Sequence, residues 1–175
     1  MIHSLAVIAL LVAPATAAAP QCVTKRQVAD AAMVLTPYFV EAITETCRAH
    51  LPADSFLVAK GAALHARLKA ESAGREASAG QMLLIAMGED LPPLKDTESL
   101  ARFMGSMAGS KIAGEIPVES CAEISSIMEA LSPLPAENIG MLVASSAALA
   151  DGGKTAGADG KPAKGLPKFK ICKNG

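Results

Sequence analysis

The sequence predicts an all-α fold: a disulfide-linked bundle of about six to seven helices that ends in a Gly/Lys-rich tail. Hydrophobic residues make up 51% of the 175 residues, aromatic residues only 3%, and Trp is absent. The interior must therefore consist mainly of Ala, Leu, Ile, Val and Met. Alanine and straight-chain residues favour helices, whereas the aromatic and β-branched residues typical of sheets are scarce. The length suits one domain with a real core.

Residues 1–18 have the features of a signal peptide. The apolar run 5–13 has the length of the hydrophobic region of such peptides, and Ala15 and Ala17 fit a small-residue cleavage site. The run is shorter than the roughly 20 residues that a membrane span needs, which argues against an uncleaved anchor. The residues before Cys22 do not form a lipobox. We therefore expect a periplasmic or secreted protein with no stable membrane insertion after cleavage.

The mature chain divides by composition into a helical domain, 19–150, and a flexible basic tail, 151–175. The tail holds six Lys, two Asp and six Gly, so it carries a charge of +4 while the rest of the chain carries −5. Segments this poor in apolar residues rarely order themselves, although Cys172 can pin the tail to the domain. An exported and slightly acidic protein is a poor partner for nucleic acid.

Strong helix signals open the mature chain. Thr24 and Gln27 form a capping box, and Val23 and Val28 stand where a hydrophobic staple would lie. Proline disfavours helical geometry in the residue before it but suits a first turn. The sequence therefore predicts that one helix ends at Pro37 and that a second begins there.

The later helix starts share a short pattern of an aliphatic residue, proline and, two residues on, an acid. The pattern occurs at 51–56, 116–121 and 134–139. Proline suits the first helical position, and the acid complements the positive helix N-terminus. Three independent helix starts explain the pattern more simply than an internal repeat. The remaining helices are predicted over 52–73 and 76–87, from an Asp96 cap after a loop at 90–94, from near Pro117 and from near Pro135.

Two expectations concern packing in the second half of the chain. Gly105, Gly109 and Gly114 should make their segment the loosest part of the core, because glycine weakens helices. In the last helix, the spacing of apolar residues predicts that Leu142 and Leu149 point inward.

The four cysteines, Cys22, Cys47, Cys121 and Cys172, predict two disulfides in an oxidising compartment. Cys22–Cys47 and Cys121–Cys172 is the favoured pairing. A hairpin turning at Pro37 would bring the first two cysteines together, whereas one kinked rod would hold them about 35 Å apart. Acidic residues near Cys121 and lysines near Cys172 favour the second pair. The first disulfide and the hairpin therefore depend on each other.

No catalytic set, metal site or cofactor site is predicted. His50 and His65 stand apart in the sequence and suit a surface, and GSMAGSK at 105–111 lacks the spacing of a phosphate-binding loop. Met104 and Met107 have a spacing suited to Cu(I), but methionine also fills gaps in a core that lacks aromatics. The carboxylate pairs one turn apart, such as Glu41 and Glu45, suit a solvated helix face.

The run C-x24-C-x3-L-P, with a proline midway, resembles small exported helical proteins of alphaproteobacteria that have no assigned activity. Its motifs are Cys22, Pro37, Cys47, Leu51 and Pro52, and it covers roughly a third of the mature chain. The resemblance implies a helical, disulfide-linked periplasmic protein and brings no site residues.

The sequence as a whole favours a non-enzymatic periplasmic or secreted protein that binds another envelope component. A methionine-based copper-binding protein is one alternative. An inhibitor or immunity-type protein for an envelope enzyme is another.

Overall fold

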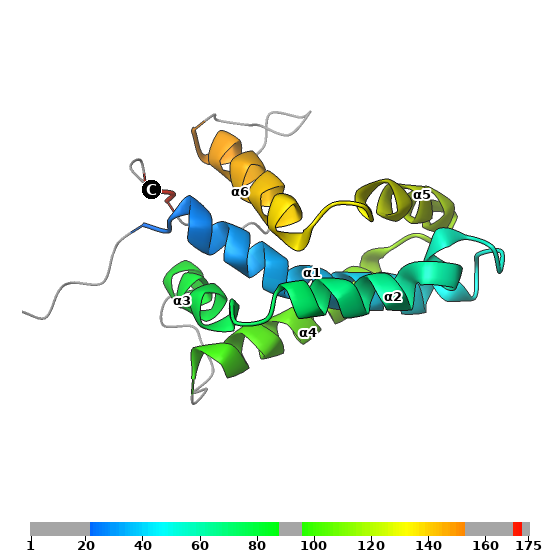
Figure 1. The fold of residues 1–175 in the computed structure, drawn as a ribbon, viewed down its shortest axis with the longest axis horizontal. Coiled ribbons are helices and arrows are strands. Elements are labelled where there is room, and N and C mark those ends of the chain that lie inside the picture. Colours follow the sequence, from blue (N-terminus) through cyan, green and yellow to red (C-terminus); the bar gives the residue numbers. More distant parts are fainter. Residues whose placement is uncertain (1–21, 88–95, 153–169, 173–175) are drawn as a thin grey trace, which may run out of the picture.

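The structure, a computed structural model, describes residues 22–87, 96–152 and 170–172 (Figure 1). Within these residues the chain forms six α-helices and one short 3-10 helix, so the predicted all-α class is confirmed. The elements are α1 (Lys25–Arg48), α2 (Phe56–Glu71), α3 (Glu76–Met87), α4 (Thr97–Glu115), η1 (Val118–Ser120), α5 (Cys121–Leu131) and α6 (Ala136–Gly152). The predicted signal peptide, the loop at 90–94 and most of the predicted tail lie outside the described residues.

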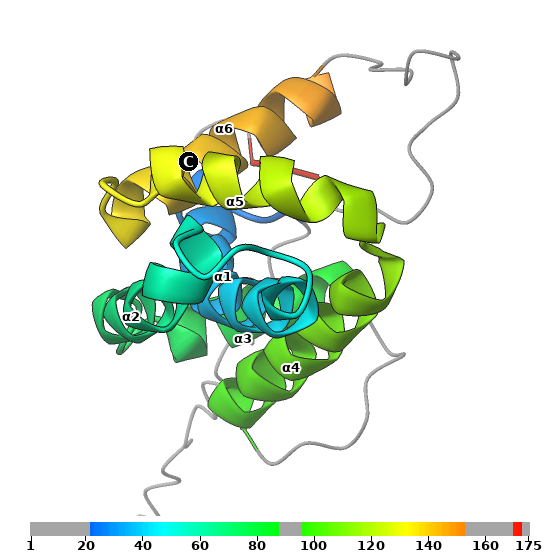
Figure 2. The same ribbon diagram turned by 90° about the vertical axis from the view of Figure 1, so that its right-hand side faces the viewer.

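Helix α1 forms the centre of the bundle. Helices α2, α3, α4 and α6 all pack against it, while α5 packs mainly against α2. Figures 1 and 2 show α6 on one side of α1 and α4 on the opposite side. A helix surrounded in this way must bury apolar side chains on several faces, and eleven residues of α1 are buried.

The predicted break at Pro37 is wrong, because α1 runs without interruption through this residue. Proline removes one helical hydrogen bond and usually kinks or ends a helix. Here Pro37 is itself buried, and the hydroxyl of Thr36 donates to the carbonyl oxygen of Ala32 at 2.6 Å. Packing against four neighbouring helices offsets the local penalty, since tertiary burial supplies most helix stability in proteins.

The favoured disulfide pairing is wrong for the same reason. Because α1 is one rod, Cys22 and Cys47 lie near its opposite ends and cannot meet. The structure pairs Cys22 with Cys172 and Cys47 with Cys121, with Cα–Cα distances of 5.2 and 5.4 Å. All four cysteines are bonded, as predicted, and Cys172 pins the end of the chain, but to the start of α1 instead of to α5.

Backbone hydrogen bonds hold the segment 170–172 beside the start of α1. The amide of Val23 donates to the carbonyl of Lys170 at 2.8 Å, and the amide of Cys172 donates to the carbonyl of Val23 at 2.9 Å. The result is an isolated parallel bridge between Val23 and Ile171. Val23, expected to staple the first helix, is completely buried under this segment.

Two helix starts predicted from side-chain caps are confirmed, whereas the helix predicted from 52 begins at Phe56. The capping box of Thr24 and Gln27 is present in full. Asp96 caps α4 by accepting a hydrogen bond of 2.7 Å from the amide of Ser99, and this bond holds the pKa of Asp96 below its ordinary value of 3.8. Both signals act within one turn of the chain, so tertiary packing does not override them.

Glycines mark close helix contacts, so the expected loose packing is wrong at Gly105 and Gly109, whereas Gly114 has no atom within 4 Å of an added Cβ. Gly105 and Gly109 are buried on α4, where an added Cβ would meet the ring and the backbone of Tyr38 on α1. Gly140 of α6 similarly lies where a Cβ would stand 2.6 Å from the carbonyl oxygen of Ala29. The lack of a side chain lets the helix axes approach, which tightens the packing against α1.

A buried carboxylate links three helices. Asp30 of α1 is 4% exposed and accepts a hydrogen bond of 2.8 Å from the hydroxyl of Ser78 on α3. The guanidinium groups of Arg26 and Arg75 lie 3.2 and 3.3 Å from the same carboxylate. Arg26 also donates at 2.8 Å to Glu137 at the start of α6, and this bond raises the pKa of Arg26. The network fixes α3 and α6 relative to α1.

A second network fixes the turn between α5 and α6 against α2. Arg67 donates to the carbonyl oxygens of Ser132 and Leu134 at 2.6 and 3.2 Å and pairs with Glu71 at 3.1 Å. Glu71 in turn accepts from the amide of Ala136 at 2.6 Å. A carboxylate at a helix N-terminus is stabilising, and here it sets the position at which α6 begins.

Candidate functional site

A groove of about 610 Å³ lies where α1, α2, α3 and α4 meet. Its floor includes the buried side chains of Val34 and Pro37. Clefts of this size hold small ligands or short peptides in other proteins. The ionisable residues that line the groove are Tyr38, Glu41, His65, Lys69, Glu76 and Arg102.

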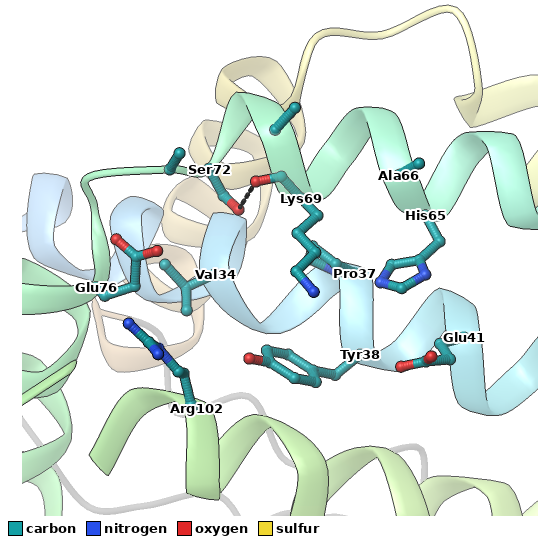
Figure 3. Close-up of a pocket in the computed structure, with 12 residues that line it drawn as sticks. Val34, Pro37, Tyr38, Glu41, His65, Ala66, Lys69, Ser72, Glu76 and Arg102 are labelled. Atoms are coloured by element: carbon teal, nitrogen blue, oxygen red, sulfur yellow. Dashed lines mark hydrogen bonds between the residues drawn. The ribbon is translucent and has the colours of Figure 1, made fainter. Parts of the chain in front are cut away.

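Packing supports the ring of Tyr38, and a hydrogen bond supports the backbone of Lys69. The ring of Tyr38 lies against Gly105, which leaves no room for any side chain at that position. Lys69 stands in the last turn of α2, where the hydroxyl of buried Ser72 donates to its carbonyl oxygen at 3.1 Å (Figure 3). Figure 3 shows the Lys69 amine and the Tyr38 ring reaching into the space between α2 and α4.

The groove has cations and carboxylates that do not neutralise one another. Arg102 pairs with Glu98 of its own helix at 3.2 Å. Among the described residues, the side chains of Lys69, Glu41 and Glu76 form no ion pair. Unpaired groups of both signs therefore line the same open groove, with Lys69 and Glu41 exposed to solvent.

A smaller hollow of about 250 Å³ lies between the start of α2 and α5. The hydroxyl of Ser125 accepts a hydrogen bond of 3.2 Å from the amide of Leu57 at its edge. The hydroxyl of Ser55 is buried there and has no partner within the described part of the chain. One small hydroxyl and a shallow volume define no ligand class.

The outer face of α6 is the second candidate surface. It carries four of the nine large hydrophobic side chains that are exposed in the described residues. These are Met141 (38% exposed), Leu142 (55%), Val143 (44%) and Leu149 (74%). No charged residue occurs from 138 to 150. This side of α6 is therefore uncharged over about two to three helical turns, and Ser145 and Ser146 lie between Leu142 and Leu149 along it.

The prediction that Leu142 and Leu149 point inward is wrong. Helix α6 packs on α1 with small residues, including Ala136, Gly140 and Ala144, all of which are buried. A pattern of leucines alone cannot identify the buried face when a second stripe, made of Ala and Gly, allows a closer approach.

The methionines considered for copper differ in exposure. Met104 is partly buried against a cluster of core residues. Met107, one turn from Met104, is 53% exposed. Core filling accounts for Met104, and copper binding by Met104 and Met107 stays a prediction.

The other motifs considered in the sequence lie in separate parts of the structure. The segment 105–111 lies inside α4 and forms no loop. His50 is exposed after α1, whereas His65 lines the groove. Among the described residues, no three His, Cys, Asp or Glu side chains gather as they would around a metal ion.

The sequence interpretation missed the groove because its residues are distant along the chain. Tyr38, Lys69 and Arg102 come from three helices and belong to no motif. One available signal was the only tyrosine of the chain, which lies beside Pro37 on α1. Nothing local indicated that Gly105 would bring α4 against it.

Comparison with protein-family models, curated proteins and solved structures finds no match for this chain. None of the helices in the described residues is long and apolar enough to cross a membrane.

Proposed function

We propose that this is a non-enzymatic, exported α-helical protein that binds another protein of the cell envelope through the outer face of α6. The partner supplies an amphipathic helix whose apolar stripe lies along Leu142 and Leu149. The compartment, periplasmic or secreted, rests on the signal-peptide features of residues 1–18 and on the pairing of all four cysteines.

The observation that supports this proposal is the concentration of four exposed apolar side chains on one helix without charged residues, with Leu142 and Leu149 at the centre of its exposed side. Isolated exposed hydrophobic residues are normal, but a contiguous patch commonly marks a contact surface. Leu142 and Leu149 are seven residues apart, so they project from one side of α6. A partner helix can lie along this stripe in the way that helices fill grooves and helix faces elsewhere.

The absence of charge determines the chemistry of the partner. Charged residues are depleted in the core of protein interfaces because desolvating them costs free energy. A stretch of thirteen residues, 138–150, offers no ion pair to a partner. The partner surface should therefore be apolar and uncharged as well.

Site-specific cross-linking tests the proposal. A photoreactive residue at position 142 should form an adduct with one heterologous protein in cells that make this chain. Leu149→Glu in the same chain should abolish the adduct. The matched control places the photoreactive residue at Lys111, an exposed position on α4, where no such adduct should form.

Binding of the purified pair completes the test, because capture alone does not establish an interface. Titration calorimetry should give one saturable site, and Leu142→Glu should weaken it at least tenfold while Lys111→Glu leaves it unchanged. An adduct of twice the chain's own mass, or equal adducts from positions 142 and 111, would contradict the proposal.

A further inference from the structure

We propose that the groove between α1, α2, α3 and α4 binds a short zwitterionic peptide, with its carboxylate at Lys69 and Arg102 and its ammonium group at Glu41. This site lies apart from the outer face of α6. It does not depend on the partner proposed for that face.

The charge pattern of the groove selects a ligand that carries both signs. Lys69 supplies a cation and Glu41 a carboxylate from two different helices, and neither has an ion-pair partner among the described residues. A purely anionic ligand would face the two carboxylates of Glu41 and Glu76, and a purely cationic ligand would face Lys69 and Arg102. A zwitterion places an opposite charge at each end.

The size and floor of the groove select a short peptide over a free ion. Its volume of about 610 Å³ falls in the range of sites for ligands with more atoms than a simple salt. Val34 and Pro37 form an apolar floor, and Ala66 and Ala70 add small apolar walls along α2. An aliphatic side chain of the ligand can lie there while its charged ends remain near the rim.

The positions of the side chains assign the two ends of the ligand. In Figure 3, Lys69 points into the middle of the groove, with Arg102 on the side of Glu76 and Glu41 on the side of His65. Arg102 already pairs with Glu98, so Lys69 is the main carboxylate donor and Arg102 assists it. Tyr38 lies between these groups, and its ring can cover an ammonium group held by Glu41.

Three ligands that differ only at their ends test this assignment. Alanyl-leucine carries both charges, its N-acetyl form carries only the carboxylate, and its C-terminal amide carries only the ammonium group. Titrations followed by NMR of the full chain should show saturable binding of alanyl-leucine, with shifts that include the amides of Ala66 and Ala70. Each modification should weaken binding about tenfold, the loss expected when a charge-assisted contact is removed.

Two variants link each end of the ligand to one side chain. Lys69→Gln should weaken alanyl-leucine and the N-acetyl form about tenfold and leave the amide unchanged. Glu41→Gln should weaken alanyl-leucine and the amide but leave the N-acetyl form unchanged. The matched controls are Lys60→Gln on α2 and Glu45→Gln on α1, both exposed and outside the groove, and neither should alter any of the three affinities.

Several results would overturn the inference. They are the absence of saturable binding of alanyl-leucine up to about 10 mM, equal affinity for all three ligands, and equal effects of a groove variant on all three. Because Lys69 and Glu41 are exposed, their replacement should leave the fold intact, which the NMR spectra of the free variants show directly. Loss of the α6 adduct described above would leave this inference unaffected.

Discussion

Asp30 is a buried carboxylate at the centre of a hydrogen-bonded network. Its carboxylate is 4% exposed, and Arg26, Arg75 and Ser78 all contact it. A buried charge is tolerated only where partners replace its lost hydration. No sequence motif indicated this site. The partners of Asp30 lie up to 48 residues away from it in the chain, and they meet it only when α3 packs against α1.

Replacing Asp30 with Asn should lower the free energy of unfolding by about 2 kcal/mol, because hydrogen bonds to a charged group contribute about 1.5–3 kcal/mol each and the neutral amide keeps only part of them. The matched control is Glu137→Gln, which removes the outer end of the same network at a side chain 54% exposed. That change should cost less than about 0.5 kcal/mol. Urea unfolding followed by circular dichroism measures both, and equal losses would refute a central role for Asp30.

At the scale of elements, small residues determine how closely helices approach α1. Gly105 and Gly109 bring α4 against Tyr38, and Gly140 brings α6 against the backbone of Ala29. The sequence predicted the starts of most helices well, since caps such as Asp96 act within one turn. The sequence could not show that these glycines, which weaken a helix, allow close contacts with residues far away in the chain.

Gly105→Ala and Gly114→Ala should change stability in opposite directions, although both lie on α4. Alanine favours a helix over glycine by about 1 kcal/mol. At Gly114 nothing lies within 4 Å of the added carbon, so the variant should gain about 0.5 kcal/mol near the helix end. At Gly105 the methyl group meets the Tyr38 ring, and overpacking should produce a net loss of about 1–2 kcal/mol.

The same urea measurement distinguishes the two glycine variants, and Gly114→Ala serves as the internal control for helix propensity. If Gly105→Ala were as stable as Gly114→Ala, the close contact between α1 and α4 would be disproved. The groove would then lack the support described for Tyr38.

Across the whole molecule, the two disulfides differ in burial and in the elements they join. Cys47–Cys121 links the end of α1 to α5 inside the core, with Cys47 0% and Cys121 1% exposed. Cys22–Cys172 is partly exposed and joins the entrance of α1 to the end of the chain. The sequence predicted four bonded cysteines but paired them wrongly, because one local rule about Pro37 determined the inferred path of the chain.

Graded reduction should open the two disulfides in order. Thiolate attack requires access to a sulfur atom, so Cys22–Cys172 should be reduced first, while the helical circular dichroism signal is retained. Cys47–Cys121 should resist until the chain unfolds. In the chain-entropy model, each bond contributes about 4–5 kcal/mol at these loop lengths, so the second step should be accompanied by loss of structure.

Alkylation of the released thiols, followed by peptide mapping, measures the order of reduction. Labelling of Cys22 and Cys172 before Cys47 and Cys121 is the expected result. Simultaneous labelling of all four, or early labelling of Cys47, would show that the inner disulfide is accessible in the folded state.

The pairing of Cys22 with Cys172 makes the protein behave as a covalent ring. Its two partners stand 150 residues apart and enclose every helix of the described structure. A protease that cuts the backbone once anywhere inside this ring opens it without releasing a fragment, and the product gains only the mass of one water. Where proteases are abundant, a molecule that has been cut once therefore keeps all its helices in one covalent unit. The helices stay at high effective concentration and can re-form the bundle.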